Sequence, residues 1–223
     1  MNKTIEYFFE QFFKHKLLIA HYTEGITPKS MVDSEVDIDG YYRWKPVKGK
    51  IKDVAYEKLE QSYGLSFPKS FIQWHKRYFF FGRDCRILNL PSSSPSAPLQ
   101  EIIHFLNNDV AKALIAEKLY PFGEDTYTGK LMVFDARIPF ADLEYPIRVY
   151  DGNGTDLYGL SEVVFSSFPK LLECLTYLFE EIHTRPIHEI ITGFSCIDPK
   201  GAGSTGINYW QEIITMEKMM LSG

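Results

Sequence analysis

The chain has 223 residues, of which 45% are hydrophobic and 15% are aromatic, and its formal net charge is −5. This length and apolar content supply enough material for a core, so the composition excludes disorder over most of the chain. The acidic balance argues against a protein that binds nucleic acid directly, because such proteins usually present a basic face to the phosphates.

The first forty residues predict an amphipathic helix followed by an irregular loop. Residues 4–20 place Phe8, Phe9 and Phe12 on one side of a helix. Residues 22–40 are polar and acidic, which favours a loop or an irregular extended segment. Charged residues interrupt the apolar ones near the N-terminus, so we expect neither a signal peptide nor a membrane-spanning segment. Three scattered cysteines fit a reducing compartment, and we expect a cytoplasmic protein.

The middle of the chain predicts a short strand and then a helical hairpin. Residues 41–47 alternate aromatic and charged side chains, which is typical of a strand. Residues 51–63 predict a helix that ends at Gly64, and Pro68 lies in the first turn of the next helix. Residues 91–98 are rich in serine and proline, which predicts an exposed loop.

The second half predicts strands first and helices afterwards. The apolar runs 119–122, 131–134 and 147–150 predict an antiparallel meander. A leucine-rich pattern after Pro169 predicts a strongly amphipathic helix. The Gly-rich residues 198–206 lack the Lys-Ser/Thr pair of a phosphate-binding loop, so we expect a flexible connector there.

Acidic residues cluster in the strand region. They are Glu124, Asp125, Asp135, Asp142, Glu144, Asp151 and Asp156, and residues 151–154 predict a turn. Three interpretations are open: turn and edge residues, catalytic carboxylates with separated pKa values, or an acidic rim that meets a basic protein. The third interpretation makes Glu124, Asp125, Asp135 and Asp151 candidate partner-binding residues.

Tyr41 and Tyr42 are aromatic candidates for the same role, because tyrosine is enriched at interface hot spots. Together with Trp44 they are equally compatible with a place in the core. The histidines and cysteines show no metal-ligand spacing, and no nucleophile motif occurs. We therefore predict no catalytic residue, no metal site and no cofactor.

Two groups of residues then appear in a defined order. The first group is Trp44, Pro46, Glu60, Gly64, Pro68 and Trp74, and the second is Pro121, Phe122, Gly123, Gly129 and Phe134. Their order and separation resemble the SUKH superfamily, which contains the yeast cell-wall synthesis regulator of the Smi/Knr type. The resemblance covers residues 41–182. Residues 1–40 would then be an N-terminal helical extension, and residues 183–223 a C-terminal extension that packs on the domain.

The resemblance implies a single α+β domain with a central, mostly antiparallel sheet flanked by helices. It also implies a non-enzymatic protein-binding module. Bacterial members are largely immunity proteins that bind a cognate polymorphic or contact-dependent toxin, often a nuclease, and fungal members are regulatory scaffolds in cell-wall synthesis and signalling. The motif residues are mostly Gly, Pro and aromatics, so we expect them to form turns and core. An enzyme with Asp125, Asp135 and Asp151 in one pocket is a third hypothesis.

Overall fold

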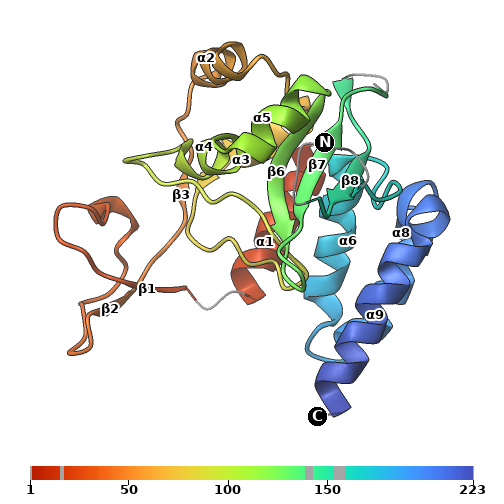
Figure 1. The fold of residues 1–223 in the computed structure, drawn as a ribbon. Coiled ribbons are helices and arrows are strands. Elements are labelled where there is room, and N and C mark those ends of the chain that lie inside the picture. The colour runs from red at the N-terminus through yellow and green to blue at the C-terminus, as the bar shows by residue number, and fades with distance from the viewer. Residues whose placement is uncertain (1, 16–17, 139–142, 153–158, 223) are drawn as a thin grey trace.

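The computed structural model describes residues 2–15, 18–138, 143–152 and 159–222 (Figure 1). Asp142 and Asp156 lie outside these residues, as does part of the predicted turn at 151–154. The described strands are β1 (Ile19–His21), β2 (Tyr41–Arg43), β3 (Val47–Lys48), β4 (Tyr78–Phe79), β5 (Leu88–Asn89), β6 (Leu119–Asp125), β7 (Leu131–Asp135) and β8 (Ile147–Tyr150).

Helices precede, interrupt and follow these strands. They are α1 (Asn2–His15), α2 (Asp53–Tyr63), α3 (Lys69–His75), α4 (Gln100–Leu106), α5 (Asp109–Ala116), α6 (Phe168–Glu181), α7 (Ile187–Ile190), α8 (Phe194–Ile197) and α9 (Ile207–Ser222), with the short helical turns η1 (Lys29–Met31), η3 (Ile191–Gly193) and η4 (Gly201–Thr205). The largest sheet is antiparallel, with the strand order β5-β6-β7-β8. The predicted α+β class in a single domain is confirmed.

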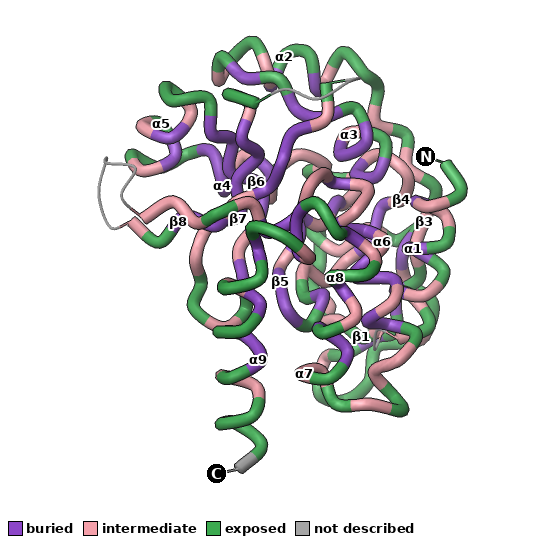
Figure 2. The backbone as a smooth tube through the Cα atoms, turned by 90° about the vertical axis from the view of Figure 1, so that its right-hand side faces the viewer, coloured by how far each residue is buried: buried purple, intermediate pink, exposed green. Residues whose placement is uncertain are grey.

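Helices cover both faces of the largest sheet, and its strands are buried (Figure 2). Phe134 of β7 points into the main core, where its ring centroid lies 5.4 Å from that of Phe71 in α3 and 6.0 Å from that of Phe168 in α6. Its neighbour Val133 packs with Leu114 of α5 in a separate cluster. Because both faces are buried, apolar residues run continuously along β7 instead of alternating with polar ones.

The predicted helical hairpin is formed by α2 and α3. Gly64 ends α2 at φ 67°, in the left-handed region that strains any residue with a side chain. The carboxylate of Glu60 accepts a hydrogen bond from the backbone N–H of Phe67 at 2.7 Å, which fixes the chain between the two helices. The hairpin thereby places Phe71 and Trp74 of α3 in the interior, against α6.

The first helix is shorter than the predicted one over residues 4–20. It ends at His15, and residues 19–21 form β1, so the prediction was wrong at the C-terminal end of this helix. The cause is a tertiary contact, because β1 pairs with β2 and this pairing outweighs local helix propensity. Phe9 of α1 stacks on Trp74 at 5.9 Å, so residues before position 41 share one core with the hairpin.

The predicted exposed loop at 91–98 is partly buried. Ser93 lies in the interior because its backbone N–H and C=O pair with those of Phe80, at 3.2 and 2.8 Å. The expectation of a fully exposed loop was therefore wrong. Backbone pairing of this kind leaves no trace in the local composition, which favours a solvated turn.

The predicted flexible connector at 198–206 contains the compact turn η4. The buried carboxylate of Asp198 accepts hydrogen bonds from the N–H and the hydroxyl of Ser166, both at 2.6 Å, and from the N–H of Gly201 at 3.1 Å. A Cβ on Gly201 would lie only 2.3 Å from the backbone nitrogen of Ser166. The glycine therefore serves close packing, and this contact attaches the C-terminal helices to the core.

His75 and Tyr56 form a buried polar pair behind the hairpin. The Tyr56 hydroxyl lies 2.7 Å from Nδ1 of His75, and Nε2 of His75 lies 3.4 Å from the carbonyl oxygen of Ser92. A carbonyl oxygen can only accept, so Nε2 carries the proton of the neutral ring and Nδ1 accepts from the Tyr56 hydroxyl. Burial lowers the pKa of His75 from 6.5 to about 4, because water cannot solvate the charged ring.

We expect acid to destabilise the fold through His75. The unfolded chain binds a proton at this histidine below pH 6.5, whereas the folded chain does so only near pH 4. This contribution to stability is complete above pH 6.5 and is lost as the pH falls. The loss reaches about 2 kcal/mol by roughly pH 5. Urea unfolding at neutral and acidic pH measures the loss, which should shrink by this amount in His75→Gln. The same pH dependence in both proteins would contradict the neutral buried ring.

Candidate functional site

Asp125, a predicted partner-binding residue, is buried in the β6–β7 turn. Its carboxylate accepts hydrogen bonds from the backbone N–H groups of Tyr127, Thr128 and Lys130 at 3.0, 2.7 and 3.2 Å. The Thr128 hydroxyl donates to it at 2.6 Å, and Gly129 completes the turn at φ 70°. The acceptor positions of this carboxylate are therefore used by its own turn, and the prediction of a surface contact at Asp125 is corrected.

Asp135, another predicted partner-binding residue, is fully buried at the opposite end of the β6–β7 pair. Arg137 donates to its carboxylate from Nε and Nη2 at 2.7 and 2.8 Å, and Arg148 donates from Nε at 2.7 Å. Burial alone would raise the pKa of Asp135, but the hydrogen bonds and charges of the two arginines outweigh it and hold this pKa below its ordinary value. Asp135 is thus an internal ion-pair residue, and this prediction is corrected too.

Glu124 and Asp151, the remaining acidic candidates, are partly exposed, and each faces a cation. Glu124 accepts a hydrogen bond from Nη2 of Arg83 at 2.6 Å, and Asp151 pairs with Nζ of Lys130 at 3.0 Å. In the described part of the sheet, the carboxylates neither converge on one pocket nor form a continuous acidic rim. The arrangement lacks the shared pocket that the enzyme hypothesis requires of these residues.

The two motif groups occupy core and turn positions. Phe122 and Phe134 stack with centroids 3.9 Å apart, and a β-bulge lies between Pro121 and Gly123. A Cβ on Gly123 would lie 2.6 Å from the carbonyl oxygen of Asn89, so glycine permits the close approach of β5. The buried motif residues are Trp44, Trp74, Pro121, Phe122 and Phe134, and the half-buried ones are Pro46 and Glu60. Pro68 lies at the start of a helix, and Gly64 and Gly129 lie in turns. These places fit a structural role.

The tyrosine candidates belong to a projecting segment. We call residues 18–44 the arm. It contains the paired strands β1 and β2 and extends from the body of the fold (Figure 1). Tyr42 and Trp44 point inward and are buried in the same core as Met31. Tyr41 points outward and is 47% exposed. Tyr42 is therefore a core residue, and its prediction as a contact residue is corrected.

The arm exposes several apolar side chains, of which Tyr41 alone was a predicted contact residue. Ile38 is fully exposed and Ile26 is 69% exposed, and Ile19, Val36 and Tyr41 are also exposed. The missed signal lies in residues 33–39, where Val36 and Ile38 alternate with acidic residues. Such a pattern indicates an extended segment with one apolar side. In the structure residues 37–40 form a turn, and both apolar side chains are exposed among the described residues.

Asp37 holds the tip of the arm in one conformation. Its backbone N–H donates to the carbonyl of Tyr41 at 2.8 Å. Its carboxylate accepts hydrogen bonds from the N–H groups of Asp39 and Tyr41 at 3.0 and 2.7 Å. Val36 and Ile38 flank this residue, so they are displayed on an ordered turn. Binding through an ordered turn loses less conformational entropy than binding through a disordered one.

The arm is also acidic. It carries the five carboxylates of Glu24, Asp33, Glu35, Asp37 and Asp39 against the two cations Lys29 and Arg43, so its net charge is −3 in a chain of −5. Asp33 pairs with Lys45 at 3.0 Å, and Asp37 is engaged in the turn. Within the residues described, the carboxylates of Glu24, Glu35 and Asp39 face no cation. Acidic groups therefore surround the apolar side chains.

The fold also joins two histidines that are far apart in the sequence. Nδ1 of His15 lies 3.1 Å from Nε2 of His183, and Nε of Arg86 donates to Nε2 of His15 at 3.3 Å. The arginine thus leaves the proton of His15 on Nδ1, which donates to His183. Across the described ranges, no three metal-ligating side chains gather around one point, and no helix is long and apolar enough to cross a membrane.

Comparison of the chain with protein-family models, with curated proteins and with solved structures found no match. Function is therefore inferred from two sources: the surface that the arm presents, and the motif groups that resemble the SUKH superfamily.

Proposed function

We propose that the protein is a non-enzymatic module that binds another protein through the arm. The observation that carries this proposal is the exposure of five large apolar side chains on one ordered segment, namely Ile19, Ile26, Val36, Ile38 and Tyr41. Several large apolar side chains exposed on one segment are typical of protein-interaction sites. Aromatic and aliphatic anchors surrounded by polar groups are also the arrangement found at interface hot spots.

The partner that fits this surface is a basic protein with an apolar depression. The carboxylates of Glu24, Glu35 and Asp39, which face no cation among the described residues, attract a basic surface, which speeds encounter and disfavours acidic partners. A stable interface buries about 800 Å² on each partner, so contact would extend from the arm to the adjoining body. The arm would supply the anchors, and the body would supply the surrounding area.

Within this class we propose toxin neutralisation in the cytoplasm as the specific role. Its support is the resemblance of the two motif groups to the SUKH superfamily, whose bacterial members are largely immunity proteins. A nuclease toxin binds a polyanion and therefore presents a basic cleft. An acidic arm with apolar anchors has the charge and the shape to occupy such a cleft and to block substrate.

Affinity capture from the host's lysate tests the role of the arm. The double variant Ile38→Asp, Tyr41→Ser is expected to weaken the captured complex about 30-fold, since loss of a hot-spot pair corresponds to about 2 kcal/mol. Its thermal stability should stay close to that of the wild type, because both side chains are exposed. Val54→Asp is the matched control, since Val54 is an exposed apolar residue of α2. Equal capture by the arm variant and the wild type would contradict the proposal.

Co-expression with the captured partner tests the specific role. We expect the wild type to restore growth to cells that produce the toxin, and the arm variant to lose most of this protection. A toxin that kills equally with and without the protein would contradict neutralisation. Capture of several signalling or envelope-synthesis proteins with modest affinity would instead favour the regulatory scaffold.

A further inference from the structure

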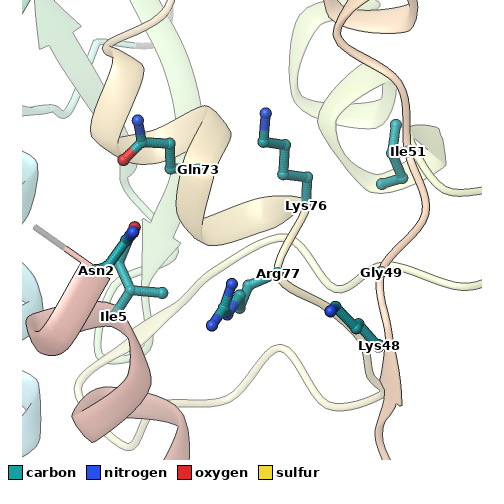
Figure 3. A pocket seen from close by; sticks show the side chains of 8 residues that line it. All are labelled: Asn2, Ile5, Lys48, Gly49, Ile51, Gln73, Lys76 and Arg77. Atoms are coloured by element: carbon teal, nitrogen blue, oxygen red, sulfur yellow. The ribbon is translucent and has the colours of Figure 1, made fainter.

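A small basic pocket lies between α1, β3 and the C-terminal end of α3 (Figure 3). Its volume is about 220 Å³. The polar side chains in its lining are Asn2, Lys48, Gln73, Lys76 and Arg77, so they are carboxamides and cations only. In Figure 3, Gln73 and Lys76 lie on the α3 side, and Lys48 and Arg77 extend toward the side where Asn2 lies. Among the described residues, no carboxylate belongs to this lining.

A close backbone contact brings two basic segments together, and the Lys76 side chain points away from those of Lys48 and Arg77 (Figure 3). The N–H of Gly49 donates to the carbonyl oxygen of Arg77 at 3.0 Å, and Lys48 pairs with Tyr78 in the β3–β4 ladder. A Cβ on Gly49 would lie 2.0 Å from the carbonyl oxygen of Lys76. Only glycine permits this approach. The pocket therefore depends on Gly49, which allows the two basic segments to lie in close contact.

The charge of the pocket is only partly neutralised by neighbours. Arg77 forms an ion pair with Glu6, and Lys76 forms one with Asp53. Lys48 faces no carboxylate in the described parts of the chain. Three cations against two carboxylates leave a net positive charge of one at the pocket. Lys48, whose charge is not neutralised by any described carboxylate, extends toward Arg77 (Figure 3).

Two further features raise the positive potential there. The short segment 48–52 carries Lys50 and Lys52 besides Lys48, although the whole chain is acidic. The pocket also includes Asn2, the first residue of α1, and no acidic residue lies in the first turn of that helix. The free N–H groups and the positive end of the dipole at a helix N-terminus favour an anion.

We propose that this pocket binds a small phosphate-bearing anion, either inorganic phosphate or a phosphate monoester. Lysine and arginine cations with carboxamide donors match a dianion that offers several acceptor oxygens. Pockets for drug-sized ligands begin at about 300 Å³, so this smaller space suits one phosphate group with a short substituent. The pocket shares no residue with the arm, so the two proposals are independent.

Titration of the full chain with inorganic phosphate at constant ionic strength, followed by amide NMR shifts, tests this site. We expect saturable shifts at residues 48–52 and 76–78. Lys48→Gln should weaken binding about five-fold, which corresponds to about 1 kcal/mol of charge interaction. Lys218→Gln removes the same charge from an exposed position in α9 and should leave the affinity unchanged. Asp53→Asn should strengthen binding, because it frees Lys76.

The same titration with glycerol phosphate separates the two sources of the anion. Similar affinities would identify the phosphate group alone as the ligand, and tighter binding of the monoester would identify a contact to the substituent. Both results support the site. Equal weakening of phosphate binding by Lys48→Gln and Lys218→Gln would mean that only the net charge of the chain matters, and it would overturn the proposed site. Shifts that do not saturate, or that spread over the whole chain, would overturn it as well.

Discussion

Replacing Phe71 with alanine is expected to lower the free energy of unfolding by about 4 kcal/mol. The ring is fully buried. It contacts the rings of Phe67, Trp74, His75, Phe122, Phe134 and Phe168. Truncation removes these contacts and leaves a cavity between α3, the sheet and α6, which close-packed neighbours cannot fill without moving. Urea denaturation followed by tryptophan fluorescence measures the loss.

Two variants control this measurement. Phe71→Leu keeps most of the volume, and we expect it to lose only about 1 kcal/mol, so it remains informative if the alanine variant does not fold. Val54→Ala changes an exposed residue of the same hairpin and should stay within about 0.5 kcal/mol of the wild type. A loss below about 1 kcal/mol for Phe71→Ala would contradict the central place of this ring in the core.

Replacing Asp135 with alanine is expected to cost about 4 kcal/mol of stability. The substitution removes the carboxylate that binds both Arg137 and Arg148, which leaves Arg148 only the more distant carboxylate of Glu162, at 3.9 Å. The side chain of Arg148 is only 17% exposed, so water can compensate it poorly. Chemical denaturation compares this variant with Asp151→Ala, whose ion pair with Lys130 is at the surface. The control should lose at most about 1 kcal/mol, and an equal loss in both would contradict the account.

The same ion pair predicts a second acid-sensitive step. The pKa of Asp135 in the folded chain lies below its ordinary value of 3.8, so its contribution is present above that value and is lost as the pH falls below it. The step of His75 occurs at higher pH, between 6.5 and about 4. Asp135→Ala should therefore remove the low-pH step and leave the other step in place.

Local signals in the sequence predicted the elements that local chemistry decides. Gly64 and Pro68 mark the hairpin of α2 and α3. Gly64 adopts the left-handed conformation that few other residues tolerate, and Pro68 directly precedes the first residue of α3, where its missing N–H costs no helical hydrogen bond. The end of α1 and the turn η4 were missed because distant partners decide them. β2 draws residues 19–21 into a strand, and Asp198 orders a Gly-rich segment by binding Ser166.

The candidate site was harder to predict than the fold. Asp125, Asp135 and Tyr42 have the residue types of a binding surface, but each is buried by contacts that only the folded chain reveals. Tyr41 is the predicted tyrosine that does lie at the surface of the arm. Exposure of Ile38 was not foreseen, since an isolated isoleucine in a polar segment ordinarily turns inward. The surface became visible only when the neighbours of each side chain were known.

Hydrogen exchange of the protein, free and in complex with its captured partner, tests the central claim that the arm is the binding surface. The claim predicts slower exchange in the complex for amides of residues 22–40, with β6 to β8 unchanged. Slower exchange confined to the turns at 125–130 and 150–152, with the arm exchanging as in the free protein, would contradict it.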